Sequence, residues 1–408
     1  MQVYVARQAV FDCKRNVYGY ELLYRTSSQS TNFDAPDSQL ATRQVVANGV
    51  FAIGMENLVG RAKVFLNFDQ NALESGWRPP IPPKDAVVEI LETVDPTPAV
   101  IDAVAKLRSQ GFLIALDDFV MADRFEPLLA LAHIIKIDIR HSSLDEQEEL
   151  ILKYRPRGIR MLAEKVETYD EFEAAKRQGF ELFQGYFFAR PQLLSGRQIP
   201  AVKIACLRLL REVQKPDIDL IALERRFHED ASFAYKLLRY VNSALFAFRD
   251  EIRSIKQALA ALGEVEIRKW VALVTLPRLS ADKPSELAAQ AMIRGRFCQS
   301  VADLAKVPSE AAFLVGLFSH LDGLVDRPMH EALSEIHVST EIQDALLGIA
   351  LPGNKLSVIY KLTRRQEMGD WDGVEAVCAA LGISADDATN CYVEAVTWTN
   401  ELLRSAVV

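Results

Sequence analysis

The N-terminal half of the chain places a polar, mostly acidic side chain at the end of almost every short apolar run. These side chains are Glu21, Asn67, Glu89, Glu92, Asp117, Asp118, Lys136, Asp138, Glu164 and Gln184. Carboxylates that share one site raise one another's pKa unless cations neutralise them. Hard cations such as Mg²⁺ and Mn²⁺ prefer oxygen ligands of this kind. If these side chains meet in space, the sequence predicts a divalent cation site.

A site of this kind would suit the cleavage of a phosphodiester. Two cations roughly 3.5–4 Å apart clamp the attacking and leaving oxygens of an in-line displacement. Lys136 would orient a water or stabilise charge on the phosphate, and Glu164 would accept the proton of the water. A single acid after a strand is also a common helix N-cap. The N-cap explanation is less satisfactory for a whole set of acids at the same end of successive strands. In a barrel the carboxyl ends of the strands meet at one mouth, where such acids would lie together.

Eight β-rich runs supply the strands that must position these groups. They are Val3–Gln8, Tyr18–Tyr24, Lys63–Phe68, Ala86–Leu91, Phe112–Leu116, Ile134–Ile137, Arg160–Ala163 and Phe180–Phe183. Amphipathic stretches lie between most of them, as at Ser38–Ile53, Thr97–Gln110 and Tyr169–Arg177. This alternation predicts a (β/α)8 TIM-type barrel. Only Ala9–Val17 separates the first two runs, so we expect an antiparallel first strand pair.

The second half reads as all-α. Apolar residues there recur at three- and four-residue spacing, as in Phe233, Leu237, Leu238, Val241 and Leu245. Prolines are expected to separate the helices, at Pro216, Pro277, Pro284, Pro308, Pro328 and Pro352. We therefore expect a barrel domain over residues 1–193 and a helical domain over residues 200–408.

The first half resembles the EAL family of bacterial cyclic-di-GMP phosphodiesterases. The similarity rests on Glu21-Leu22-Leu23-Tyr24-Arg25, Glu89-Ile90-Leu91-Glu92, Asp117-Asp118-Phe119, Lys136-Ile137-Asp138, Ala163-Glu164-Lys165-Val166-Glu167 and Gln184-Gly185-Tyr186. The resemblance implies a two-metal Mg²⁺ or Mn²⁺ site with Glu21, Asn67, Glu89, Asp117, Asp118 and Asp138 as ligands. It also implies that Glu164 is the general base and that Lys136 orients the water. Leu23, Arg25 and Gln184 would contact the dinucleotide, and Glu92 would brace the loop after the paired aspartates.

One segment and two single residues depart from the family pattern. The family continues its paired aspartates into a Gly-Thr-Gly-Tyr-Ser-Ser segment that supports metal binding and homodimer contacts, whereas this chain has Val120–Phe125. Both glycines are lost, so positive φ angles are energetically unfavourable in this segment. Leu22 replaces an alanine and Lys165 replaces a glycine, and we expect both changes to be mild. Two hypotheses stay open: a hydrolase of cyclic-di-GMP, and a non-catalytic receptor or scaffold that binds cyclic-di-GMP or a protein.

The second half resembles the HDOD domain. The similar stretches are 230–233, 236–238, 241–246, 252–255 and 258–263. HDOD domains generally lack the metal site of the HD hydrolases, and no His-Asp dipeptide occurs in this chain. The nearest approach is His320-Leu321-Asp322, where we interpret His320 as a capping or surface residue. We expect this half to be a regulatory domain that binds a protein partner.

Composition narrows the partners and the compartment. A net charge of −8 argues against a broad nucleic-acid surface. Five cysteines without a CxxC pair suit a reducing compartment better than a disulfide framework. No apolar run approaches the ~20 residues that a membrane span requires, and no signal peptide is read. We therefore expect a cytoplasmic protein with no membrane span.

Overall fold

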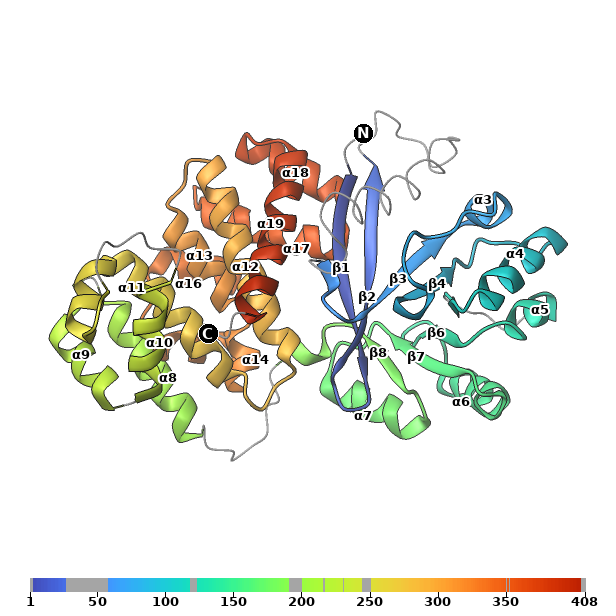
Figure 1. The fold of residues 1–408 in the computed structure, drawn as a ribbon, viewed down its shortest axis with the longest axis horizontal. Coiled ribbons are helices and arrows are strands. Elements are labelled where there is room, and N and C mark those ends of the chain that lie inside the picture. The colour runs from blue at the N-terminus through green and yellow to red at the C-terminus, as the bar shows by residue number, and fades with distance from the viewer. Residues whose placement is uncertain are drawn as a thin grey trace. The chain divides into compact units, whose positions relative to one another are not determined.

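The computed structural model describes residues 3–26, 58–117, 123–190, 200–215, 217–229, 231–243, 251–349, 351 and 353–404. The chain divides into two compact units. One comprises Met1–Phe188 with Gln366–Trp371, and the other comprises Ala189–Arg365 with Asp372–Val408. The first unit carries the strands and the second is helical (Figure 1).

Eight strands close into a barrel in the order in which they occur in the chain. They are β1 Val3–Asp12, β2 Val17–Thr26, β3 Lys63–Phe68, β4 Ala86–Ile90, β5 Leu113–Leu116, β6 Ile134–Asp138, β7 Arg160–Glu164 and β8 Leu182–Gln184. Each predicted strand overlaps an observed one, so the (β/α)8 prediction is confirmed.

The first strand runs against its neighbours. β1 pairs antiparallel with both β2 and β8, and the remaining neighbours from β2 to β8 pair in parallel. The turn between β1 and β2 is held by Asp12, whose Oδ1 accepts hydrogen bonds from the backbone N–H groups of Lys14 at 2.8 Å and Asn16 at 2.9 Å. The predicted antiparallel first pair is confirmed, because a four-residue turn leaves no room for a crossover helix.

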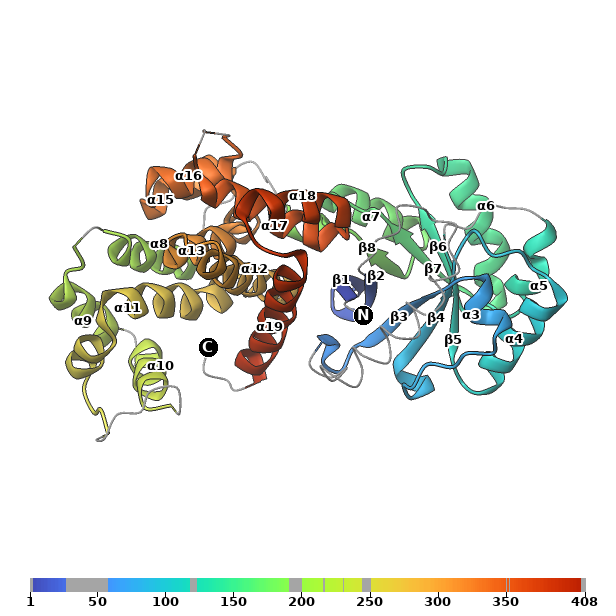
Figure 2. The same ribbon diagram turned by 90° about the horizontal axis from the view of Figure 1, so that it is seen from above.

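Helices follow the strands on the outside of the barrel (Figure 2). They are α3 Gln70–Glu74, α4 Pro98–Ser109, α5 Glu126–Leu129, α6 Leu144–Tyr154 and α7 Tyr169–Gln178, with short 3-10 turns η2 Pro83–Asp85, η3 Asp123–Phe125, η4 Arg155–Arg157 and η5 Phe187–Ala189. Capping boxes begin two of them, Ser143 with Glu146 and Thr168 with Glu171. The predicted helix Ser38–Ile53 lies outside the described residues.

The barrel interior is filled by a layer with one buried residue from seven of the strands. These residues are Val10, Phe65, Val87, Ala115, Ile134, Leu162 and Leu182. Side chains alternate between the two faces of a strand, so residues two positions further on also point inward. This apolar layer forms the floor beneath the mouth of the barrel.

The second unit is all-α in the part of the chain that the structure describes. Its helices are α8 Ala201–Val213, α9 Leu220–Glu229, α10 Ala231–Val241, α11 Ile255–Leu279, α12 Ser285–Leu304, α13 Ser309–Phe318, α14 Leu321–Val325, α15 Met329–Ile336, α16 Thr340–Leu347, α17 Lys355–Met368, α18 Trp371–Leu381 and α19 Ala385–Arg404. Within the described ranges, none of these helices is long and apolar enough to cross a membrane.

The prolines of this half behave as expected with one exception. Pro284, Pro308 and Pro328 occupy the N-cap positions of α12, α13 and α15. Pro277, however, lies inside α11 and does not separate two helices. The prediction fails there because Pro277 falls in the last turn of a long helix. Pro216 and Pro352 lie outside the described residues.

His320 occupies the N-cap position of α14, but its side chain makes no capping hydrogen bond and it is not on the surface. Only 5% of it is exposed. It lies between the end of α13 at Phe318 and the start of α14 at Leu321, two helices with buried side chains, so it cannot reach solvent. Its Nε2 atom has no hydrogen-bonding partner among the described residues. Burial, followed by the nearby Arg294 and Arg364, lowers the pKa of His320 well below its ordinary value.

Candidate active site

The polar residues of the mouth form the layer next to the apolar floor of the barrel. On six strands, the residue two positions after the floor residue is polar: Asn67, Glu89, Asp117, Lys136, Glu164 and Gln184. On β1, which runs in the opposite direction, the corresponding residue is Gln8, two positions before Val10. The period of two along a strand therefore places these side chains at one rim.

On β2 the same alternation places Gly19 at the level of the floor and Glu21 at the level of the mouth. A Cβ atom added to Gly19 would lie 2.7 Å from Phe65 Cε2, closer than carbon atoms approach without strain. The glycine lets the ring of Phe65 fill the floor at the point where β2 passes. Glu21 then rises directly above this position, and only 7% of the residue is exposed.

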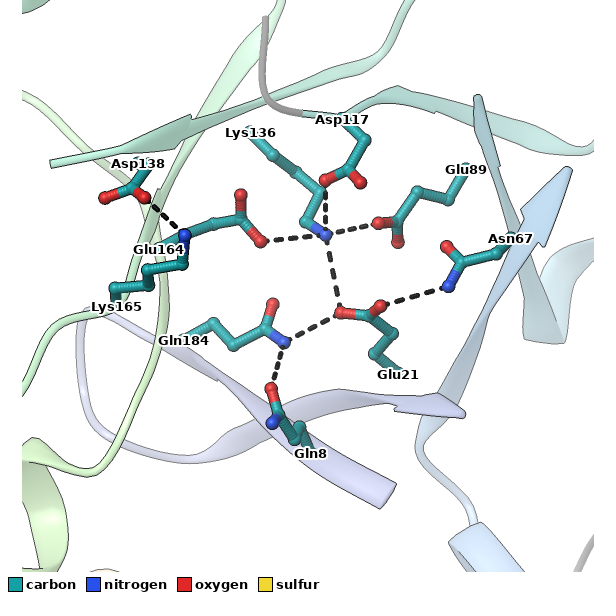
Figure 3. A network of polar contacts seen from close by, with 10 residues as sticks. All are labelled: Gln8, Glu21, Asn67, Glu89, Asp117, Lys136, Asp138, Glu164, Lys165 and Gln184. Carbon is teal, nitrogen blue, oxygen red and sulfur yellow. Dashed lines mark hydrogen bonds and ion pairs between the residues drawn. The ribbon is translucent and has the colours of Figure 1, made fainter. Parts of the chain in front are cut away.

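The ammonium group of Lys136 lies at the centre of four carboxylates (Figure 3). Its Nζ atom is 2.8 Å from Asp117 Oδ1, 2.9 Å from Glu164 Oε1 and 3.4 Å from Glu21 Oε2, and it also contacts Glu89. Lys136 is 1% exposed. Four carboxylates against one ammonium leave a formal excess of three negative charges when all are ionised. This excess is what a bound cation would neutralise.

Amide side chains from two other strands hold Glu21 in place. Asn67 Nδ2 donates to Glu21 Oε1 at 3.2 Å, and Gln184 Nε2 donates to Glu21 Oε2 at 2.8 Å. Gln184 Nε2 also donates to Gln8 Oε1 at 3.0 Å. The two oxygens of Glu21 are thus oriented by strands β3 and β8, and β1 supports the second contact.

Burial and charge move the pKa values of this cluster in opposite directions. Burial raises the pKa of Glu21, but Lys136 and the two amides outweigh burial and hold the value below its ordinary range. Burial, and then the neighbouring charge of Glu21, raise the pKa of Glu89 well above its ordinary value. Burial likewise raises the pKa of Glu164 to about 8. Burial disfavours the ammonium form of Lys136, yet the four carboxylates raise its pKa well above the usual value. Without a cation, burial and the neighbouring negative charges therefore favour the protonated forms of Glu89 and Glu164.

Asp138 stands apart from this cluster although it lies two residues beyond Lys136. Its Oδ2 atom is 2.5 Å from Lys165 Nζ and 2.7 Å from His141 Nδ1. Its Oδ1 atom accepts a hydrogen bond from the backbone N–H of Arg140 at 2.8 Å. Burial raises the pKa of Asp138, but the hydrogen bonds from Lys165 and the Arg140 backbone, together with the charges of Lys165 and His141, outweigh burial, and the net shift is downward. Asp138 is therefore an ionised carboxylate with its own counter-charge.

The remaining predicted residues lie at the edge of the site or outside the described residues. Glu92 is exposed, and it lines a pocket beside the mouth instead of joining the Lys136 cluster. Leu23 is half-buried and lies two residues beyond Glu21 on β2. Arg25 belongs to β2, where its backbone pairs with Tyr4, and nothing further is described for its side chain. Asp118 lies outside the described residues, as do the first three residues of the segment Val120–Phe125.

Sequence reasoning missed three contributors: Gln8, His141 and Lys165. Gln8 was missed because it lies on the one antiparallel strand, where the mouth residue comes before the floor residue in the chain and not after it. The strand alternation from Val10 was the available signal. His141 gave no signal, and Lys165 appeared only as a replaced glycine.

A pocket of about 760 Å³ opens beside Asp117 and Asp138. Half of its lining residues are apolar, among them Leu116, Leu128 and Ile137, and the other half are polar or charged, with Arg124 among several carboxylates. The guanidinium of Arg124 lies 4.6 Å from the centre of the Phe125 ring, which also lines the pocket.

The donor atoms of the Lys136 cluster fit a hard divalent cation. They are carboxylate and amide oxygens, and the buried Glu89 Oε2 has no hydrogen-bonding partner among the described residues. Over the same residues, no three His, Cys, Asp or Glu side chains are spaced as a ready metal site. Lys136 lies in the space that the carboxylates surround, so it would have to move aside for an ion. Asp138 does not fit equally well, since Lys165 already neutralises it.

The family follows from comparison with known proteins. The EAL domain model matches residues 70–191 and the HDOD domain model matches residues 199–339. Together with the closed barrel and its acidic mouth, these matches define a two-domain protein of the EAL–HDOD class. The chain is 35% identical over 405 residues to the cyclic di-GMP phosphodiesterase CdgJ of Vibrio cholerae, covering 98% of this chain and 93% of that protein. It therefore belongs to the EAL–HDOD family.

Two further comparisons extend this finding. The uncharacterized protein YuxH of Bacillus subtilis is 34% identical over 414 residues, covering 99% of both proteins. Among solved structures, the BlrP1 protein of Klebsiella pneumoniae in a complex with manganese and cyclic-di-GMP is 25% identical, with a TM-score of 0.38. That match covers 46% of this chain and 55% of the other, and its TM-score is too low to support a functional argument.

Proposed function

We propose that the barrel hydrolyses cyclic-di-GMP to linear pGpG with the help of Mg²⁺ or Mn²⁺. The observation that carries this proposal is the cluster of four carboxylates around the buried Lys136, with an excess of negative charge at one rim. The relative CdgJ, which is 35% identical over 98% of this chain, is a cyclic-di-GMP phosphodiesterase by name. An acidic site of this kind repels a phosphodiester unless a cation is present, which is why the proposal includes a metal.

Each residue has a distinct part in the proposed reaction. Glu21, Asn67, Glu89 and Asp117 would hold the cation, with Asp118 as a further ligand. When bound, the cation would neutralise the phosphate and lower the pKa of a water molecule. Glu164 would accept a proton from the attacking water, a role that suits a carboxyl whose pKa is about 8. Lys136 would donate a hydrogen bond to the phosphate as negative charge develops there.

The dinucleotide would extend from the rim into the neighbouring pocket. Gln184 carries a buried carbonyl oxygen, Oε1, that has no hydrogen-bonding partner among the described residues and can accept a hydrogen bond from the substrate. The apolar side chains of the pocket and the Arg124–Phe125 pair suit a guanine base, which binds through its flat face and its polar edge. By the family resemblance, Leu23 and Arg25 on β2 would also contact the substrate.

The test is product formation by the full chain. Purified protein is incubated with cyclic-di-GMP and Mn²⁺, and pGpG is separated by chromatography. We expect Glu21→Ala and Glu164→Gln to lower the rate by at least about 100-fold, in the range usual for a general base. Glu181→Gln is the matched control, because Glu181 pairs with Arg155 and Arg160 at the other end of the barrel. No product from the wild-type protein, or equal loss in the control, would refute the proposal.

A second function is favoured by one observation. Lys165 neutralises Asp138, so part of the acidic mouth is already charge-balanced without a metal. This arrangement suits a receptor that binds cyclic-di-GMP and passes its state to a protein partner of the helical domain. Titration with the dinucleotide in the presence of a chelator separates the two functions. Binding that persists without metal, combined with no pGpG, supports the receptor.

A further inference from the structure

One carboxylate oxygen of Asp138 contacts two donor groups, and the other contacts one. Lys165 Nζ and His141 Nδ1 both approach Oδ2, at 2.5 and 2.7 Å, and the Arg140 backbone N–H binds Oδ1 at 2.8 Å. Only 5% of Asp138 is exposed, whereas the Lys165 side chain is about half exposed. A solvent-accessible ammonium therefore covers a buried carboxylate at the rim of the mouth.

The backbone of Lys165 is strained. Its φ angle is +56°, in the left-handed region that non-glycine residues rarely adopt. Such a conformation is unfavourable for a residue with a side chain and persists at sites where the surroundings demand it. The similar family motif has glycine at this position, which adopts the same angle without strain. In this chain the strained residue is a lysine whose ammonium contacts Asp138. This combination points to a role for the positive charge at this position.

The two sides of the mouth differ in how their charge is balanced. Around Lys136, four carboxylates share one ammonium, and Glu89 Oε2 has no hydrogen-bonding partner within the described residues. Around Asp138, one carboxylate faces the ammonium of Lys165 (Figure 3). The imidazole of His141 also contacts this carboxylate. A divalent cation gains most where negative charge is in excess, which is the Lys136 side.

We propose that the Lys165 ammonium takes the place of a second divalent cation at Asp138, so that the mouth takes up one divalent cation and not two. This inference rests on the proposed metal-dependent function of the same site. It assigns Lys165 as a positioning residue that supplies a fixed positive charge. The phosphate of the substrate would then meet one exchangeable cation and one that belongs to the protein.

The experiment measures how many Mn²⁺ ions the full chain binds in the absence of nucleotide. Titration calorimetry gives the number of ions, and electron paramagnetic resonance detects the coupled spectrum of two neighbouring Mn²⁺ ions. We expect about one ion and no coupled spectrum for the wild-type protein. Lys165→Met removes the ammonium but keeps the strained backbone, and Lys165→Gly removes both. Both variants should bind about two ions, because Asp138 is then free to act as a ligand.

Two further variants serve as matched controls. Lys165→Arg keeps the positive charge and should still bind one ion. Adding Asp138→Asn to Lys165→Met removes the freed carboxylate and should return the number to one. Circular dichroism verifies that each variant is folded, and Lys165→Gly is the variant least at risk because glycine relieves the strain.

Three results would overturn the inference: two ions or none in the wild-type protein, or no additional ion in Lys165→Gly. Catalysis is not part of the readout, so the inference and the proposed function fail separately. A wild-type protein that binds one Mn²⁺ without forming pGpG would contradict only the function. A wild-type protein that forms pGpG with two bound ions would contradict only the inference.

Discussion

Gln184 on the last strand donates a 2.8 Å hydrogen bond to Glu21 on the second, across the antiparallel strand that separates them. The same Nε2 atom reaches Gln8 on that intervening strand. This contact orients an oxygen that would otherwise be free to turn toward Lys136 alone. In metal sites, hydrogen bonds to the ligands contribute strongly to affinity.

Gln184→Met therefore tests the contribution of this contact. The change keeps the approximate length of the side chain and removes the donor without adding a charge. We expect Mn²⁺ affinity, measured by titration calorimetry, to fall by about 10–100-fold. Gln178→Met, at the end of α7 outside the barrel, is the control and should leave the affinity unchanged. An unchanged affinity in Gln184→Met would show that Glu21 needs no orientation from β8.

Cation uptake should depend on pH through Glu89 and Glu164. The pKa of both groups is raised, that of Glu164 to about 8, so Glu164 is largely protonated at neutral pH in the absence of a cation. Carboxylates bind a cation only when ionised, and binding therefore releases protons. We expect Mn²⁺ affinity to rise as the pH increases from 6 to about 8. The heat of binding at pH 7 should vary with the ionisation enthalpy of the buffer, and an affinity independent of pH would contradict this assignment.

Lys136→Met should destabilise the barrel in the absence of metal. The ammonium is buried, and its removal leaves four carboxylates without their shared counter-charge. Breaking a buried ion pair on one side typically costs about 3–5 kcal/mol, and protonation of Glu89 and Glu164 would reduce that loss. Urea unfolding followed by circular dichroism measures the change. Lys153→Met on the exposed face of α6 is the control, and Mn²⁺ should restore part of the lost stability.

The helical unit should lose stability when the pH falls below about 6.5. The pKa of His320 is lowered in the folded state, so the unfolded chain binds a proton at this residue more readily than the folded chain. The stability that the neutral imidazole contributes is therefore fully present above the unfolded-state pKa and is lost as the pH falls below that pKa. Between pH 6.5 and pH 5 a buried neutral imidazole costs up to about 2 kcal/mol of unfolding free energy. His320→Gln should flatten this dependence, whereas His330→Gln, at an exposed position of α15, should not. Parallel pH profiles for the two variants would exclude His320 as the cause.

Much of the barrel and of its mouth could be predicted because both follow from the period of two along a strand. Apolar runs such as Val87–Val88 and Leu113–Leu116 indicated strands, and the polar residues that followed them indicated the rim. Pairing between side chains could not be read in this way. The contact of Lys165 with Asp138 depends on a left-handed backbone angle that no sequence spacing encodes. Likewise, the burial of His320 depends on helices that meet only in the folded unit.

The antiparallel first hairpin has a practical consequence for the study of this protein. Its turn, Cys13–Asn16, lies at the rim opposite the acidic mouth, where Cys13 Sγ donates to the carbonyl of Glu181 at 3.5 Å. A reporter group attached at Lys14 or Arg15 would thus be joined directly to the strand that carries Gln8, yet remain a full strand length away from any bound nucleotide. Occupancy of the mouth could then be followed by fluorescence without a label in the path of the substrate.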